Sequence, residues 1–542
     1  MSRTRARRRQ RRQLLLIGGI LFVSLCICGL AATLLGQRIL DVILEREPAT
    51  ESAVFTWEPD SAELTVAVSP VMAPTLRERV EAFNRQGLRT PDGQTMQVAL
   101  VEQPPQKMVQ LSLGQPPFQA IVPDSALWLS QIDQGWADAH PSEGAGIAPR
   151  RVNDPVRFAV SPIVIAAWED VARSLGWPDR PVGWQDIQQK AAQDPDFKWN
   201  HPSTAHAAGM LATLAEFYAG AGVTRGLTAE LATQQSVLDY VRDVEATVRF
   251  YGEGEEVIVQ RLAAEGRAFL DAFVAQEQTV IAWNQVHPDE RLVAIYPKEG
   301  ALWTDHPLAL LELGGRGELE VTANQRRTFR AFADFLLSPE SQQAFLAAGY
   351  RPADLSIPLD GPGSPFANTD AVDPTQPETT LQIPSADVVE VVLNVWWYTK
   401  RPTNVYLVVD TSGSMAGSKL ERTQAALQSF VAQIQGNRDK IGLVEFGSGV
   451  KHFEPLRVMD DAGRMRLINL IADMRVDGST ALLDAVWTAF NDLQMVGDQE
   501  AINAIVVMTD GQENASQYSI GDLRRAFERA NTPVVVFTIA FG

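Results

Sequence analysis

The chain has 542 residues, which is enough for about three folded domains at roughly 100–200 residues each. With 45% hydrophobic and 21% charged residues, its composition excludes both a disordered chain and a polytopic membrane protein. The formal charge of −19 argues against nucleic-acid binding. The only two cysteines lie in an apolar N-terminal segment, so disulfides and thiolate metal sites are excluded from the remainder.

The N-terminal segment predicts a membrane anchor. Seven arginines in residues 1–12 form a basic tail ahead of an uncharged apolar segment at residues 13–37, which is long enough to cross a hydrocarbon core of roughly 30 Å. The positive-inside rule places the tail in the cytoplasm and everything after Arg38 outside the membrane, in an extracellular or periplasmic space. A cleaved signal peptide ending near Gly29-Leu30-Ala31 is the alternative, although its apolar region usually has only about 7–15 residues. A polar stalk is expected at residues 38–62.

Residues 63–355 alternate between apolar strands and amphipathic helices, which predicts an α/β domain. Strands are expected near 63–70, 118–123 and 156–168, and the segments 74–86, 209–222, 257–276 and 326–350 have helical periodicity. The acidic segment 251–256 is interpreted as a solvated turn, because it lacks the ligand spacing of a calcium-binding loop.

The order of these segments resembles the bacterial extracellular solute-binding proteins of the type II periplasmic-binding fold. The resemblance is carried by LTVAVSP, AIVPDSALWL, PVGWQDI, KWNHPSTAHAAGML, AIYPKEGALWTDHPLALL and FLLSPESQQAFLAAGYRP. It implies two α/β lobes that close over a small solute, which touches strand–helix turns of both lobes. By position, the residues that it places in such turns are Ser69, Asp124, Ser125, Ser161, Ser203, Thr204, Trp303 and Asp305. A serine or threonine at a helix start caps the helix and leaves amide donors that suit an oxyanion or a sugar hydroxyl, and Ser203-Thr204 before the helix at 207–218 is the clearest case. Helix capping alone is the alternative role for each serine and threonine.

Residues 356–402 are interpreted as a connector, rich in Pro, Gly and Asp at first and helical from about residue 386. The strongest motif follows at residues 403–542. An apolar strand ends in the D-x-S-x-S pattern of residues 410–414, Thr480 lies just before a helix, and Asp510 ends another buried strand. Because the carboxyl ends of parallel strands gather at one edge of an open α/β sheet, five oxygen-bearing side chains can converge there.

This segment resembles the von Willebrand factor A-type domain with its metal-ion-dependent adhesion site. By that resemblance, a divalent cation is held by Asp410, Ser412, Ser414, Thr480 and Asp510. Hydroxyl and carboxylate oxygens without His or Cys suit Mg²⁺, with Mn²⁺ or Ca²⁺ as alternatives. Such an ion retains affinity for one more anionic oxygen, which an Asp or Glu of a partner protein can supply. A Ser/Gly-rich turn with an acidic cap is the alternative interpretation. The family's fold normally continues beyond residue 542 with a further helix and strand, so either a fragment or a different closure is expected.

The expected fold is α/β throughout: a two-lobed periplasmic-binding-like domain, then a doubly wound, mostly parallel von Willebrand factor A-type sheet, after one transmembrane helix. We expect a membrane-anchored binding protein that grips an acidic group of a protein partner through its cation. The alternative is a solute receptor for transport or sensing, with the cleft of residues 63–355 as the primary site. No enzyme is expected, because the six histidines form no triad-like motif. A metal-assisted hydrolase is the remote alternative.

Overall fold

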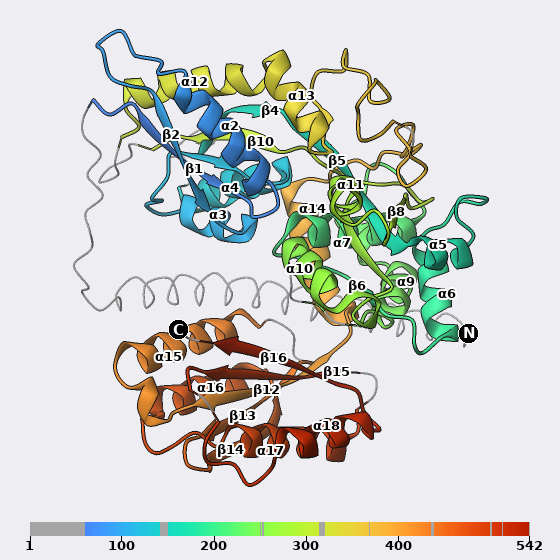
Figure 1. Ribbon diagram of the computed structural model, residues 1–542, viewed down its shortest axis with the longest axis vertical. Coiled ribbons are helices and arrows are strands. Elements are labelled where there is room, and N and C mark those ends of the chain that lie inside the picture. The colour runs from blue at the N-terminus through green and yellow to red at the C-terminus, as the bar shows by residue number, and fades with distance from the viewer. Residues whose placement is uncertain are drawn as a thin grey trace, which may run out of the picture. The chain divides into compact units, whose positions relative to one another are not determined.

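Figure 1 shows the computed structural model of the protein. It describes residues 60–140, 150–249, 251, 254–313, 320–367, 369–434, 438–498, 501–511 and 513–540. The predicted basic tail, the membrane anchor and nearly all of the stalk lie outside these ranges. Across the described ranges, no helix is both long enough and apolar enough to cross a membrane.

The first lobe is built on a five-stranded sheet with the strand order β2-β1-β3-β10-β4. The strands are β1 (Glu63–Val68), β2 (Gln97–Glu102), β3 (Ala120–Val122), β4 (Val152–Arg157) and β10 (Pro307–Leu311). β1 pairs in parallel with β2 and β3, whereas β10 is antiparallel to β3 and β4. The helices are α2 (Ala73–Arg85), α3 (Pro105–Ser112), α4 (Ala126–Ala139), α12 (Ala323–Leu336) and α13 (Pro339–Ala347). Their apolar faces form one core with the sheet, in which the Phe83 and Phe332 ring centroids lie 5.2 Å apart.

The second lobe has a six-stranded sheet in which β11, β5, β7 and β6 are neighbours and β8 and β9 also pair with β5. Its strands are β5 (Ala159–Trp168), β6 (Trp199–Asn200), β7 (Ala272–Gln276), β8 (Leu292–Ile295), β9 (Trp303–Thr304) and β11 (Arg351–Pro352). The helices are α5 (Glu169–Leu175), α6 (Trp184–Gln193), α7 (Ala207–Ala221), α8 (Ala229–Ala232), α9 (Gln235–Glu245), α10 (Glu255–Glu265) and α11 (Glu277–Val286). The α7 helix is buried on all sides over residues 207–218. Accordingly, its apolar residues lie all round the helix and not on one face only.

The chain crosses between the two lobes more than once. β4 of the first sheet is followed at once by β5 of the second, and β9 of the second sheet is followed by β10 of the first. Each sheet has a hydrophobic core of its own. The predicted two-lobed α/β architecture is therefore confirmed.

Two expectations for residues 251–276 are wrong. The predicted helix at 257–276 ends at Glu265, because Gly266 takes a φ of +59°, and after a short 3₁₀ turn (η1, Gly266–Ala268) residues 272–276 form the buried strand β7. A short apolar run does not distinguish a buried strand from a buried helix. The acidic turn is not fully solvated either, because Glu255 starts α10 and is only 2% exposed.

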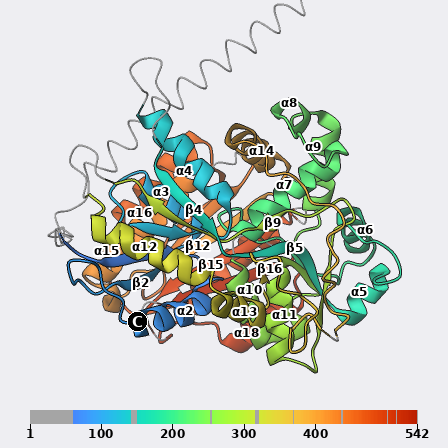
Figure 2. The same cartoon turned by 90° about the horizontal axis from the view of Figure 1, so that it is seen from above.

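The predicted connector packs against the second lobe. Its Ala371 carbonyl accepts a hydrogen bond from the backbone N–H of Ala294 in β8, at 2.7 Å, and Thr380 forms a bridge with Ala301. The helix expected near residue 386 is α14 (Ala386–Thr399), which contacts α9, α8 and α7. Figure 2 shows α14 beside α7, with α8 and α9 nearby.

The last domain has a five-stranded sheet with the order β14-β13-β12-β15-β16. The strands are β12 (Thr403–Asp410), β13 (Lys440–Phe446), β14 (Val450–Val458), β15 (Ile502–Thr509) and β16 (Val534–Ala540). All neighbours are parallel except the edge strand β14. α15 (Ser418–Gln433) and α16 (Asp461–Asp473) cover one face, and α17 (Leu482–Val496) and α18 (Ile520–Glu528) cover the other (Figure 1). The doubly wound, mostly parallel sheet is thus confirmed, and its strand order reverses direction at β12, where ligands of such sheets usually bind.

Candidate functional site

The five predicted cation ligands come together at the carboxyl edge of the last sheet. Asp410 ends β12 and is fully buried; its Oδ1 accepts a hydrogen bond from the Ser412 N–H at 2.8 Å, and its Oδ2 accepts one from the Thr509 hydroxyl. The Ser412 and Ser414 hydroxyls are 3.1 Å apart, and Ser414 Oγ donates to Asp510 Oδ1 at 2.7 Å. Three of the five residues belong to one turn, and Asp510 reaches that turn from the end of β15.

Thr480 reaches the cluster of Asp410, Ser412, Ser414 and Asp510 from a third segment. The surroundings of Gly511 show how close together the side-chain oxygens of the cluster lie. A Cβ atom built on Gly511 would lie 3.1 Å from Thr480 Oγ1, 3.4 Å from Ser414 Oγ and 3.6 Å from Asp410 Oδ2. The loops are joined by backbone hydrogen bonds, from the Gly413 N–H to the Gly478 carbonyl at 3.0 Å and from the Ala481 N–H to the Gly447 carbonyl at 2.7 Å. The cluster is therefore held in place by the sheet and by its neighbouring loops.

The chemistry of this cluster fits a hard divalent cation. Its donor atoms are carboxylate and hydroxyl oxygens, the ligand types that Mg²⁺, Mn²⁺ and Ca²⁺ prefer. Burial opposes ionisation of Asp510, but hydrogen bonds from Lys419 and Ser414 outweigh it and lower the pKa of this carboxyl. Gly413 and Ser414 are exposed, so the cluster is open to solvent on one side.

Of the residues predicted to contact a solute, four lie in a second cluster between strands of the two lobes: Ser69, Asp124, Ser161 and Asp305. Ser69 follows β1 and its hydroxyl donates to Asp124 Oδ1, while Ser161 in β5 accepts the Gln278 N–H at 3.1 Å. Asp305 Oδ1 accepts the Ala126 N–H at 2.7 Å and so holds the start of α4.

The other predicted residues serve local structure. Ser125 caps α4 by accepting the N–H of Leu127 at 3.2 Å. Ser203 does not cap α7, because α7 starts only after His206 and the Ser203 hydroxyl accepts the Ala205 N–H at 3.2 Å within the preceding turn. Thr204, the next residue in that turn, is half-buried. Capping of α7 by Ser203-Thr204 was therefore wrong. Trp303 is directed to the connector, since its Nε1 donates to Thr380 Oγ1 at 3.2 Å.

Four further buried residues, which the sequence analysis did not place in a solute site, complete this second cluster, which we call the interlobe cluster: Glu255, Gln276, His306 and Tyr350. Glu255 Oε1 accepts the Gln276 N–H at 2.8 Å and also the Thr279 hydroxyl. Gln276 Oε1 lies 2.9 Å from His306 Nε2, and His306 Nδ1 lies 3.6 Å from Asp124 Oδ1. Tyr350 packs edge-on to the His306 ring, with centroids 5.0 Å apart. The His306 backbone adopts a φ of +31°, which is unusual for a residue with a side chain.

The interlobe cluster is buried and incompletely hydrogen-bonded. Burial raises the pKa of Asp124 and of Glu255 to about 7 and lowers the pKa of His306 to about 3. Within the described residues, Glu255 Oε2, Gln276 Nε2 and His306 Nδ1 have no hydrogen-bond partner although they are buried. Buried polar atoms are nearly always paired, so such atoms are typical of a place where a ligand or ordered water completes the contacts.

A pocket of about 670 Å³ lies elsewhere, between the connector and the second lobe. It is lined by residues 177–182 and 294–298 of the lobe and by residues of the connector between 369 and 379. None of the residues predicted to bind a solute or a cation lines it.

Comparison with known proteins supports both expected domains. The family model described as "Bacterial extracellular solute-binding protein" matches residues 64–351, which is more than half of the chain, and the model described as "von Willebrand factor type A domain" matches residues 405–512. The predicted resemblance to these two families, in this order, is confirmed. Both are families of binding or adhesion domains rather than of enzymes.

Individual relatives are more distant. Inter-alpha-trypsin inhibitor heavy chain H4 from Bos taurus is 26% identical over 148 residues, which cover 26% of this chain and 16% of that protein. The chain thus spans about a sixth of the length of the curated relatives it matches. Among solved structures, the sulfate-binding protein SubI from Mycobacterium tuberculosis H37Rv has 17% identity and a TM-score of 0.38, covering 55% of this chain and 89% of SubI. The von Willebrand factor type A structure from Catenulispora acidiphila has 17% identity and a TM-score of 0.24, covering 26% of this chain and 34% of that one.

Proposed function

The chain belongs to the bacterial extracellular solute-binding protein family, and from this premise we propose that it is a two-module binding protein without enzymatic activity. Its C-terminal module holds a protein partner through a divalent cation, and its N-terminal module binds a small solute. In this proposal the arginine-rich tail and the apolar segment at 13–37 anchor the chain in the cell membrane, with both modules outside, extracellular or periplasmic.

The observation that carries the proposal is the convergence of five oxygen-bearing side chains around Gly511. Mg²⁺, or Mn²⁺ or Ca²⁺ in its place, would be held there by Asp410, Ser412, Ser414, Thr480 and Asp510. When bound, the ion would supply an electrophilic position for an anionic oxygen. The carboxylates of Asp410 and Asp510 carry only two negative charges, which balance the two positive charges of the ion. A third carboxylate, from a partner protein, can therefore still bind to the ion.

The surroundings of the cluster favour adhesion over metal-assisted hydrolysis. Hydrolysis would require a base positioned beside the ion, and the hydrogen bonds of the five residues among the described positions involve no histidine. The Lys419 ammonium pairs with Asp510 Oδ2. The exposed Gly413 and Ser414 leave one side of the cluster accessible to a large partner.

Affinity capture with the detergent-solubilised full chain tests this proposal. The chain is immobilised, incubated with envelope proteins in Mg²⁺ and eluted with a chelator, and Mn²⁺ binding to the same preparation is measured by electron paramagnetic resonance. Asp410→Ala removes a central ligand, whereas Asp461→Ala is the matched control, because Asp461 is 93% exposed in the same domain. We expect Mn²⁺ binding and a chelator-released partner with the wild type and with Asp461→Ala only. Equal Mn²⁺ binding by Asp410→Ala would overturn the proposal.

A second candidate function, a solute receptor for transport or sensing, is favoured by the interlobe cluster. Its polar groups come from both lobes, and three of its buried atoms lack partners among the described residues. The hydrogen bonds and ion pairs of Asp124, Glu255, Gln276 and His306 in the described residues involve no arginine or lysine. We therefore propose a solute rich in hydrogen-bond donors, such as a polyol or an amine, rather than an oxyanion.

Thermal melting of the full chain with a panel of ligands tests this second function. Sugars, polyols and short amines form one arm, and sulfate and phosphate form the other. A rise in melting temperature with a member of the first arm, lost in Gln276→Leu, would support the receptor function. Stabilisation by the oxyanions alone would contradict the chemistry proposed for the cluster.

A further inference from the structure

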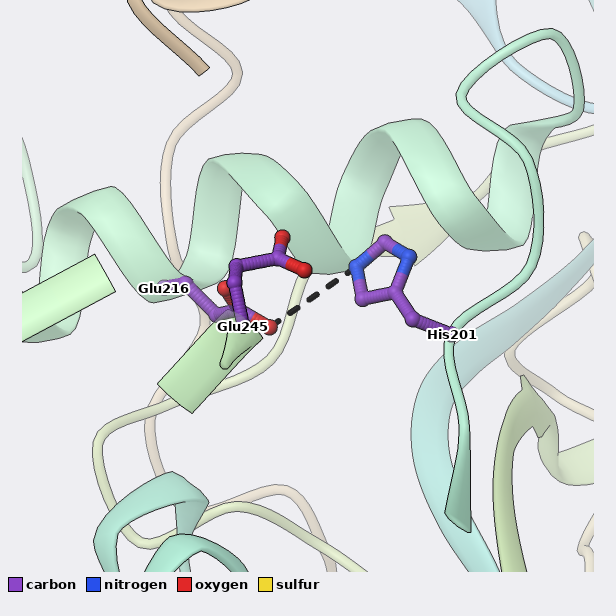
Figure 3. A group of neighbouring side chains, drawn as sticks. All are labelled: His201, Glu216 and Glu245. Atoms are coloured by element: carbon purple, nitrogen blue, oxygen red, sulfur yellow. Dashed lines mark ion pairs between the residues drawn. The ribbon is translucent and has the colours of Figure 1, made fainter. Parts of the chain in front are cut away.

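Three buried side chains meet in the second lobe, apart from both clusters described above. His201 follows β6, Glu216 lies in the middle of α7 and Glu245 is the last residue of α9. All three are 0% exposed, and their nitrogen and oxygen ligand atoms lie within 4.8 Å of one another. Figure 3 shows the two carboxylates turned toward the imidazole ring. We call these residues the His–Glu–Glu cluster.

The His201 ring is held so that its Nε2 atom faces this cluster. Its Nδ1 lies 2.8 Å from the Pro202 carbonyl oxygen, which can only accept, so Nδ1 carries the proton. The other ring nitrogen, Nε2, faces the cluster and lies 3.7 Å from Glu216 Oε1 and 3.5 Å from Thr213 Oγ1. A backbone carbonyl that fixes one ring nitrogen while the other faces carboxylates is the arrangement found around metal-binding histidines.

Glu216 is the second observation that points to a ligand. Apart from the neighbouring Glu245 carboxyl, neither of its carboxylate oxygens has a hydrogen-bond partner among the described residues, although the side chain is completely buried. It stands in an otherwise apolar helix, whose residues 207–218 are all buried. A buried, unpaired carboxylate is costly unless a proton or a cation compensates its charge.

Glu245 is positioned from the side of the connector. Its Oε1 accepts a hydrogen bond from Trp396 Nε1 of α14, and its Oε2 accepts one from the Tyr251 hydroxyl. Both donors are neutral, and the ion pairs of the His–Glu–Glu cluster among the described residues include no lysine or arginine. Two acidic side chains therefore face one imidazole ring with no lysine or arginine paired to them among the described residues.

We propose that His201, Glu216 and Glu245 form a buried binding site for one divalent transition-metal ion such as Zn²⁺. One imidazole nitrogen with two carboxylates suits zinc or a similar first-row ion better than Mg²⁺ or Ca²⁺, which prefer oxygen ligands only. Ligand atoms about 2.1 Å from a tetrahedral zinc ion are about 3.4 Å apart. The 3.7 Å between His201 Nε2 and Glu216 Oε1 is close to this spacing, and the three ligand atoms, which lie within 4.8 Å of one another, would have to draw together around an ion.

Such an ion would join α7, α9 and the loop after β6, and through Trp396 it would hold α14 against the lobe. The competing explanation is a proton. Burial, together with the neighbouring Glu245, raises the pKa of Glu216 well above its usual value, so the carboxyl can instead be neutralised by protonation. The experiment therefore has to distinguish a bound metal from a bound proton.

The full chain carrying Asp410→Ala is used for the test, so that the cation site proposed in the last domain does not contribute. After removal of metal with a chelator, the protein is equilibrated with zinc in excess Mg²⁺, and zinc per chain is measured by mass spectrometry. Cobalt is added in a parallel experiment, because its visible absorption reports tetrahedral coordination. Glu216→Gln and Glu245→Gln are the test variants. Glu299→Gln is the matched control, since Glu299 is a partly buried glutamate of the same lobe.

We expect one tightly bound zinc per chain, a rise in melting temperature with zinc, and cobalt absorption bands in the Asp410→Ala background and in the Glu299→Gln control. Glu216→Gln and Glu245→Gln should each lower the zinc affinity by at least about tenfold, since even groups that only orient metal ligands contribute about 10–100-fold. Absence of bound zinc in the Asp410→Ala background would overturn the metal site and leave the protonated pair. Equal zinc binding by Glu216→Gln and Glu245→Gln would overturn it as well.

Discussion

Gly511→Ala is the sharpest perturbation of the proposed cation site, because it adds one methyl group at the centre of the cluster and removes no ligand. The new Cβ would lie 3.1 Å from Thr480 Oγ1 and 3.4 Å from Ser414 Oγ. Both are side-chain oxygens that can give way by a few tenths of an ångström. Such crowding costs about 1 kcal/mol or somewhat more, and the lower chain entropy of alanine offsets about 0.4–1 kcal/mol.

The free energy of unfolding should therefore change by about 1 kcal/mol or less, whereas cation binding should weaken strongly. A methyl carbon facing Asp410 Oδ2 at 3.6 Å occupies space that the ion and its open position need. We expect the Mn²⁺ affinity to fall by more than tenfold, which corresponds to more than about 1.4 kcal/mol. Isothermal titration with Mn²⁺ measures the affinity, and thermal melts in chelator measure the stability separately.

Gly449→Ala is the control, since a Cβ there would meet no atom within 4 Å. It should change neither the Mn²⁺ affinity nor the melting temperature appreciably. If Gly511→Ala binds Mn²⁺ as tightly as the wild type, the oxygens around Gly511 do not surround an ion, and the proposed use of the site is refuted.

Two further predictions concern the interlobe cluster and the junction before β12. Folding raises the pKa of Asp124 to about 7, so the stability that Asp124 contributes is fully present below about pH 4 and is lost as the pH rises to 7. Folding lowers the pKa of His306 to about 3, so the stability that His306 contributes is lost in the opposite direction, as the pH falls from about 6.5 to 3. The Asp124→Asn variant should therefore lose less melting temperature than the wild type between about pH 5 and 7. Asp138→Asn changes an exposed residue and is the control, which should behave like the wild type. Equal pH profiles for Asp124→Asn and the wild type would show that Asp124 is not the titrating group. Lys400→Met removes one partner of a buried ion pair with Asp439 at 2.9 Å, and denaturant unfolding should show a loss of about 3 kcal/mol, at the low end for such pairs because Thr403 still donates to Asp439. Lys440→Met, which removes a half-exposed pair at 3.7 Å, should cost less than about 1 kcal/mol, and equal losses for both variants would contradict this difference.

The proposed cation cluster could be predicted because its residues lie in local motifs at strand ends. Asp410 and Asp510 each end an apolar run, and parallel strands put such ends at one edge whatever the details of packing. The three segments therefore converge once the sheet forms. Only the pinning of the loops by backbone hydrogen bonds, such as Gly413 to Gly478, lay beyond the sequence pattern.

The interlobe cluster could be predicted only in part, since its contacts depend on two lobes built from interleaved segments. Ser69 and Asp124 follow strands and were predicted, but Glu255 lies in the acidic segment interpreted as a solvated turn and Gln276 ends a segment with helical periodicity. The helix ends at Gly266, and the strand that follows carries Gln276 into the cluster. Periodicity over short apolar runs does not reveal this change.

The His–Glu–Glu cluster left one signal in the sequence. Glu216 is the only charged residue in the run GMLATLAEFYAGAG, where every other residue of the helix is apolar or small. A charge in a helix that is apolar all round has no solvated face to occupy, which indicates a buried partner. Its partners, His201 and Glu245, are 15 and 29 residues away in unrelated patterns, so no spacing rule could identify them.

The short junction between α14 and β12 has a mechanical consequence. Only residues 400–402 separate the two elements, and within them Lys400 is tied to Asp439 while the Arg401 guanidinium donates to the carbonyls of Val248 and Ala501. A force applied to the sheet edge that carries Asp410 would act on β12 and be transmitted to α14, because no flexible linker lies between the two elements. The Trp396–Glu245 hydrogen bond would then bear part of that tension, so a force applied to the last domain would reach the lobe that holds the His–Glu–Glu cluster.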